Sequence, residues 1–145
     1  MNKIVSMKMK SSGVMDNAVN FVVRNQLKNR ATWAKAVEVY GTREDGVDGR
    51  WRGEYFGKQM RGAALIYEYT QDEELYEILT ETVLDLLTRQ DEYGRFSTYA
   101  VESEFHGWDM WCRKYVLMGL EYFYDICKSQ TLKQEMLEVM KKHLD

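Results

Sequence analysis

The sequence predicts an all-α protein built from stacked antiparallel helical hairpins. Three observations favour this fold class. The 145-residue chain contains no proline, the residue that most strongly breaks helix interiors. Apolar side chains recur at helical spacing along most of the chain, as they do on the buried face of an amphipathic helix. A unit of long loop, helix, tight turn and second helix also occurs twice, with an offset of 57 residues.

The N-terminal part is expected to contain two helices. Residues 1–15 are interpreted as a frayed N-terminal segment, and residues 16–145 as one helical-hairpin domain with a real core. The first helix begins near Asp16, whose carboxylate can cap free N–H groups. A second helix runs from about Thr32 to Tyr40, and Gly41 ends it.

The first long loop and the first hairpin follow. Residues 41–53 contain two Asp-Gly pairs, at 45–46 and 48–49, which are typical of turns. Their spacing is loosely similar to a calcium loop, but the terminal glutamate ligand is missing, so plain turns are expected. A helix then runs from about Glu54 to Tyr69. Gly62 in its middle predicts a close approach of another helix.

The second half repeats this order. Asp72 caps a helix that reaches about Gln90. Residues 91–108 form a second long connection, in which 96–101 can be a short extended piece. A helix runs from about Asp109 to Cys127, and Ser129 caps a last helix. The residues expected to face inward on that last helix are Leu132, Met136, Val139, Met140 and Leu144.

Composition excludes several classes of partner. The net charge of −3 provides no basic patch, so neither nucleic acid nor an anionic membrane is expected as a partner. No run of about 18 apolar residues is present, and no apolar segment follows the N-terminal lysines, so neither a membrane span nor a signal peptide is expected. Cys112 and Cys127 are interpreted as free thiols, and the protein as cytoplasmic.

The repeat has a geometric consequence for the site. Both long loops precede the first helix of a hairpin, so parallel stacking of the hairpins would bring the long loops to one end. Binding residues concentrate on loops held by a rigid scaffold. Such hairpins form an open solenoid or a closed toroid, and six pairs would need roughly twice this chain or more. The candidate residues at this end are Trp51, Glu54, Trp108, Asp109 and Trp111.

Two interpretations remain open for each candidate. Trp108 and Trp111 share a helix face, either as core or hairpin packing or as an aromatic platform for a sugar ring or another flat apolar face. Asp109 and Glu54 are either simple helix N-terminal carboxylates or groups that bind hydroxyls, and the two could act as acid and base. Arg113 and Lys114 are interpreted either as a partly solvated pair or as partners of Glu54, Glu102 or Glu104.

Other chemistry is weakly indicated. His106 lies in the second long loop and is expected to face solvent rather than to be catalytic, although it is kept as a candidate pocket residue. His143, in the last helix, is expected to be structural or exposed. The two histidines are far apart and have no nearby ligand set, so no metal site is expected. Cys112 is interpreted as a small buried hydrophobe.

Several motifs together resemble a known family. They are WRGEYFGK at 51–58, YEYTQDEEL at 67–75, QDEYGRFSTY at 90–99 and GWDMWCRKY at 107–115. In this order and spacing they resemble the N-terminal part of the β-L-arabinofuranosidase-like glycoside hydrolases, family 127 and its relatives. The resemblance covers about residues 50–145. Many relatives have histidine where this chain has Arg113.

The resemblance implies an (α/α)6 catalytic barrel that hydrolyses glycosidic bonds with retention, so that this chain would form a partial (α/α)6 toroid. It implies a cysteine nucleophile, a glutamate acid/base and a zinc ion held by cysteine and glutamate, all from a later part of the barrel. Cys112 and Cys127 do not match those motifs. The resemblance carries over only Trp108, Asp109, Trp111 and, more loosely, Glu54, as residues of a carbohydrate pocket.

The sequence-level expectation is therefore an N-terminal fragment of a glycoside hydrolase, inactive alone, with no identified catalytic residue and no cofactor of its own. Self-association or a missing C-terminal part would cover its open apolar flank. The alternatives are a non-enzymatic helical-repeat binding module, or another (α/α)6 sugar enzyme such as an epimerase or lyase.

Overall fold

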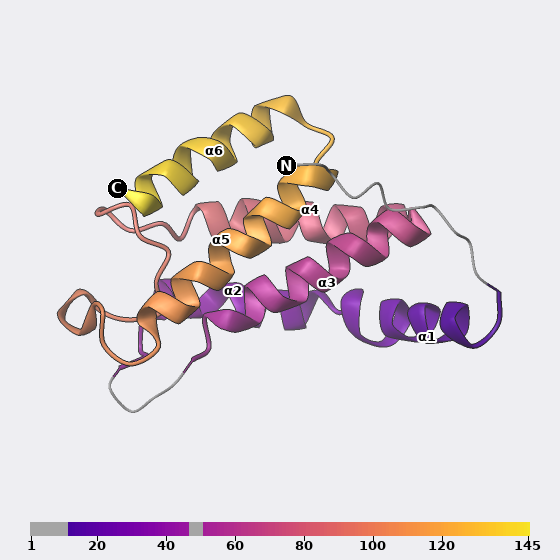
Figure 1. The fold of residues 1–145 in the computed structure, drawn as a ribbon, viewed down its shortest axis with the longest axis horizontal. Coiled ribbons are helices and arrows are strands. Elements are labelled where there is room, and N and C mark those ends of the chain that lie inside the picture. The colour runs from indigo at the N-terminus through magenta and orange to yellow at the C-terminus, as the bar shows by residue number, and fades with distance from the viewer. Residues whose placement is uncertain (1–11, 47–50) are drawn as a thin grey trace.

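The computed structural model describes residues 12–46 and 51–145, and within these ranges the protein is all-α, as predicted (Figure 1). The described part contains six α-helices and, in place of a sheet, one isolated parallel bridge between Asp45 and Tyr99. A π-helical turn, Val23–Leu27, extends the first helix, and a 3-10 turn, Val101–Ser103, lies in the second long loop. The α-helices are α1 Val14–Val22, α2 Arg30–Thr42, α3 Glu54–Thr70, α4 Glu73–Leu87, α5 Asp109–Ile126 and α6 Gln130–Leu144.

Side-chain caps mark the start of three of the six described α-helices, α2, α4 and α6. The side chain of Asp72 accepts a hydrogen bond from Leu75 N at 2.9 Å, and Ser129 Oγ accepts one from Leu132 N at 3.2 Å, as predicted. The predicted cap at Asp16 is wrong, because α1 begins earlier, at Val14, and places Asp16 inside its first turn. Residues 1–11 and the Asp-Gly pair at 48–49 lie outside the described residues.

The two hairpins pack through a close crossing of α3 and α5, which run side by side in the same direction (Figure 1). At the crossing, a Cβ added to Gly57 would lie 1.8 Å from the carbonyl oxygen of Tyr115. A Cβ on Gly119 would lie 2.9 Å from the Cα of Gly57. The close approach predicted at Gly62 is wrong, because no atom lies within 4 Å of a Cβ built there. Only glycine at position 57 permits the backbones to approach this closely.

The described residues form one apolar core cluster, centred on α2, α3, α4 and α5 and extended by residues of α6. The largest side chains in it are fully or almost fully enclosed, as expected for apolar residues at helical spacing. Its central members are Tyr40, Phe56, Met60, Ile78, Leu86, Leu120 and Phe123. No helix in the described ranges is both long enough and apolar enough to cross a bilayer.

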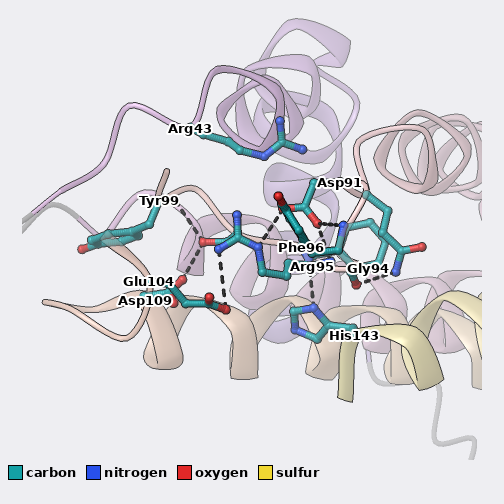
Figure 2. A network of polar contacts seen from close by, with 12 residues as sticks. Arg43, Asp91, Gly94, Arg95, Phe96, Tyr99, Glu104, Asp109 and His143 are labelled. Carbon is teal, nitrogen blue, oxygen red and sulfur yellow. Dashed lines mark hydrogen bonds and ion pairs between the residues drawn. The ribbon is translucent and has the colours of Figure 1, made fainter. Parts of the chain in front are cut away.

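Helix α6 is anchored by a buried histidine rather than by its last leucine. His143 Nδ1 accepts a hydrogen bond from Phe96 N at 2.8 Å (Figure 2), and its side chain is only 9% exposed. Leu144, which was expected to face inward, is 72% exposed. The buried backbone N–H of Phe96 needs an acceptor, and this requirement determines which side of α6 faces the core.

This histidine should make the stability depend on pH. Burial, together with the nearby charge of Arg113, lowers the pKa of His143 from 6.5 to about 4. The unfolded chain therefore binds this proton more readily than the folded chain does. The contribution of neutral His143 to the free energy of unfolding should be complete above pH 6.5. As the pH falls from 6.5 to 4, the free energy of unfolding should decrease by about 3 kcal/mol.

The control variant is His143→Asn, whose side-chain oxygen can replace Nδ1 as the acceptor and does not titrate in this range. Urea unfolding of both proteins, measured at intervals from pH 7.5 to pH 4, isolates the contribution of His143 as the difference between the two curves. Parallel curves would contradict the assignment.

Candidate functional site

The predicted site residues include three tryptophans that form one aromatic surface. The ring centroids of Trp51 and Trp108 are 6.2 Å apart, those of Trp108 and Trp111 are 5.9 Å apart, and those of Trp111 and Tyr115 are 5.1 Å apart. Each contact is edge-to-face, the geometry that aromatic quadrupoles favour. We call these four residues the tryptophan surface.

The fold explains why this surface forms. Trp51 precedes α3, and Trp108 immediately precedes α5, so the parallel crossing of the two helices brings both loop-to-helix junctions together. This confirms the juxtaposition predicted from the repeat. Trp51, Trp108 and Trp111 are 48%, 44% and 39% exposed, so these rings pack on one another outside the buried core. Large half-exposed aromatic groups in contact with one another are typical of a binding surface.

Glu54 joins the two helices beneath this surface. Its Oε2 accepts a hydrogen bond from Trp111 Nε1 at 2.5 Å, and its Oε1 accepts one from Lys58 Nζ at 2.7 Å. Burial alone would raise the pKa of Glu54, but the hydrogen bonds from Lys58 and Trp111 outweigh burial and lower the pKa below its usual value. Glu54 is therefore an ionised acceptor that orients Trp111, and it is poorly suited to act as a general acid.

Asp109 lies behind the surface rather than on it. Its side chain has no exposure, and Ser97 Oγ donates to its Oδ1 at 2.5 Å, while Phe105 N donates to its Oδ2 at 3.0 Å. Arg113 Nε lies 3.1 Å from Oδ2. Asp109 therefore fixes the second long loop on the start of α5 in this conformation, and it does not share one open site with Glu54.

Arg113 completes this buried network. The residue is 8% exposed, and its Nη2 donates to Glu104 Oε1 at 2.5 Å. Figure 2 shows Glu104 and Asp109 beside the neighbouring Arg95. Of the two alternatives for Arg113, the structure shows the pairing with a glutamate, and the partly solvated position is wrong for this residue. His106 is exposed on the same loop, as expected, and its Nδ1 lies 2.9 Å from the carbonyl oxygen of Glu104.

Two lysines at the tryptophan surface were not identified as site residues from the sequence. Lys114 Nζ lies 3.6 Å from the ring centroid of Trp111, and Lys58 Nζ lies 5.0 Å from that of Tyr115. Helical spacing could have identified them, because Lys114 is three residues from Trp111 and Lys58 is four residues from Glu54, which places each pair on one helix face.

A cavity of about 860 Å³ lies between the second long loop, α5 and α6. Its lining is mostly apolar and includes Lys114 but none of the three tryptophans. A second groove of about 510 Å³ continues along α5 and α6 past Leu117 and Met140. Both grooves therefore lie along α5 and α6.

The described residues do not fit a zinc site. No group of three or more histidine, cysteine, aspartate or glutamate side chains within 12–46 and 51–145 is arranged to hold a metal ion. Both cysteines are buried free thiols, as predicted. No catalytic step is therefore derived through a metal.

Cys112 should be chemically inert in the folded protein. Its side chain has no exposure, and burial raises the pKa of its thiol from 9.0 to about 11. A rise of this size reduces the thiolate fraction about 100-fold at neutral pH, and access is blocked as well. In a Cys127→Ser variant, labelling by an aromatic disulfide reagent should be at least about 100-fold slower in buffer than in denaturant. Comparable rates in the two conditions would contradict this.

Comparison with known proteins agrees with the resemblance noted from the motifs. A search of curated proteins and a search of solved structures each returned no match. One family model matches, over residues 5–145, and it is described as the catalytic domain of β-L-arabinofuranosidase, GH127. Because this match spans nearly the whole chain, the chain belongs to the GH127 β-L-arabinofuranosidase-like catalytic-domain family.

Proposed function

We propose that this chain contributes one wall of a carbohydrate pocket in a glycoside hydrolase that acts on arabinofuranosyl-type or related sugars. The observation that carries the proposal is the tryptophan surface, a half-exposed aromatic patch at the end of a rigid helix pair. Sugar rings present an apolar face of C–H groups that packs on such aromatic groups. The complete pocket would be an (α/α)6 toroid in which further hairpins cover the apolar α5–α6 grooves.

Polar groups at the edge of the surface would complete the recognition. Glu54, ionised and nearly buried, accepts hydrogen bonds, and Lys58 beside it donates them. Such a pair can bind neighbouring hydroxyl groups of a sugar while the ring packs on Trp111. Asp109 has the supporting role of holding the loop that carries His106 and Trp108.

The 145-residue chain alone should not hydrolyse glycosides. Cys112 is buried and protonated, Glu54 has a lowered pKa, and the described residues provide no metal-binding group. Release of p-nitrophenol from aryl arabinofuranosides by the purified chain would overturn this part of the proposal. Binding of sugar without hydrolysis would fit a pocket wall and, equally, a binding module.

The aromatic contacts provide the direct test of binding. Replacing Trp111 with alanine should weaken binding of a methyl arabinofuranoside about two- to twelvefold, because one stacking contact is worth about 0.5–1.5 kcal/mol. Phe21→Ala is the matched control, since Phe21 is a 61% exposed aromatic residue on α1. Binding is measured by saturation-transfer NMR. Equal effects of the two substitutions, or no saturable binding by the unmodified chain, would contradict the proposal.

A further inference from the structure

One of the contacts of Trp111 covers its ring. The indole N–H donates to Glu54, and the ring contacts Trp108 and Tyr115 edge to face. The ammonium group of Lys114 lies 3.6 Å from the centroid of the same ring, which places it over the ring face. A sugar ring that packs on an aromatic face needs the same position. In this conformation Lys114 therefore closes this face of Trp111 to a ligand.

The helix explains how Lys114 reaches this position. Lys114 and Trp111 are three residues apart on α5, so their side chains share one helix face. Long side chains on a helix point back toward its N-terminus, which directs Lys114 onto the turn that carries Trp111. Tyr115 adds a second contact, since its ring centroid lies 4.4 Å from Lys114 Nζ. Glu54 attracts the ammonium group as well, although its ion pair, at 2.7 Å, is with Lys58.

This cover is weakly held and has space to move. Lys114 is exposed, and a cation–π contact is weak at an exposed site. The residue also lines the cavity of about 860 Å³ between the second long loop, α5 and α6. Open space therefore lies beside the ring, and the flexible lysine side chain can turn into it.

We propose that Lys114 is a movable cover of the tryptophan surface, which a sugar displaces from Trp111 when it binds. This inference rests on the proposed role of the surface as a wall of a carbohydrate pocket. The displaced side chain turns toward the cavity, and the sugar packs on the uncovered ring. Because the cation–π contact is lost in this exchange, Lys114 lowers the affinity of the surface for sugars.

Removing the cover should strengthen binding. Lys114→Ala should bind methyl arabinofuranoside about two- to fivefold more tightly than the unmodified 145-residue chain, as measured by saturation-transfer NMR. This factor corresponds to the loss of an exposed cation–π contact of about 0.5–1 kcal/mol. Lys114→Arg should bind as the unmodified chain does, because a guanidinium group also stacks on aromatic faces. In a Trp111→Ala background, Lys114→Ala should no longer increase the affinity, because the covered ring is absent.

Lys133→Ala is the matched control. It removes the same charge and also a cation–π contact, since Lys133 Nζ lies 4.9 Å from the ring centroid of Tyr124. Tyr124 lies near the other end of α5, away from the tryptophan surface. Lys133→Ala should therefore leave the affinity for the sugar unchanged. An equal gain in Lys114→Ala and Lys133→Ala would mean that net charge alone changes the affinity, and it would overturn the cover.

The displacement has its own readout, which separates the two proposals. In the free protein, ring currents should shift the Hε protons of Lys114 upfield, and saturating sugar should remove this shift. Hε signals that are unshifted in the free protein, or that sugar does not move, would overturn the cover. Saturable binding with no gain in Lys114→Ala would also overturn the cover and leave the sugar-binding wall standing. Absence of saturable binding by every variant would overturn both.

Discussion

Gly57→Ala is expected to lower the free energy of unfolding by about 3–5 kcal/mol, or to prevent folding altogether. The added Cβ would lie 1.8 Å from the carbonyl oxygen of Tyr115, and backbone atoms cannot move aside as a flexible side chain can. The helices α3 and α5 would have to separate at their crossing. The same separation would break the hydrogen bond between Glu54 and Trp111, and with it the tryptophan surface.

Gly62→Ala in the same helix is the matched control. A Cβ at position 62 meets no atom within 4 Å, so the substitution should raise the free energy of unfolding by about 0.5–1 kcal/mol through better helix propensity. Urea denaturation followed by circular dichroism measures both variants. Effects of the same sign at positions 57 and 62 would contradict the assigned crossing point.

This pair of glycines shows what the sequence could and could not reveal about the fold. The helix starts at Asp72 and Ser129 were predictable, because a cap is a local contact between residues three apart. The close approach was predicted at Gly62 because a glycine in the middle of a helix often marks a helix–helix contact. The glycine alone does not indicate which neighbouring helix faces it. The choice between positions 57 and 62 depends on how α5 lies across α3, which is a tertiary property.

The end of α6 was misjudged for a similar reason. Hydrophobicity alone favours Leu144 as the inward residue, but the buried N–H of Phe96 requires an acceptor, and His143 provides one. Phe96 lies 47 residues away in an irregular loop, and no periodic pattern predicts that contact.

The repeat predicted that the two loop-to-helix junctions lie together. The offset of 57 residues aligned Trp51 with Trp108, and the structure brings these two rings together. It also joins Glu54 to Trp111, a pair separated by the same offset. The burial of Asp109 could not be predicted, because its partners Ser97 and Phe105 come from a loop without regular structure.

Asp109→Ala should lower the free energy of unfolding by about 3–5 kcal/mol. Arg113 would keep its charge at 8% exposure with Glu104 as its remaining close partner, and the Ser97 hydroxyl would lose its acceptor. The Phe105 N–H would also be left unpaired. Asp109→Asn should lower the free energy of unfolding less, because the amide oxygen of asparagine still accepts a hydrogen bond. Some cost should remain, because Arg113 would keep only one of its two carboxylate partners, Glu104.

The chain contains a matched exposed pair that separates burial from pairing. Asp85 and Arg89 have the same spacing as Asp109 and Arg113, but their side chains are 40% and 37% exposed. Asp85→Ala should therefore cost less than about 1 kcal/mol. Urea unfolding of the two alanine variants under one condition compares them directly. An equal cost would mean that the network of Asp109 stabilises the loop no more than a surface ion pair does, and that the tryptophan surface rests on the α3–α5 crossing alone.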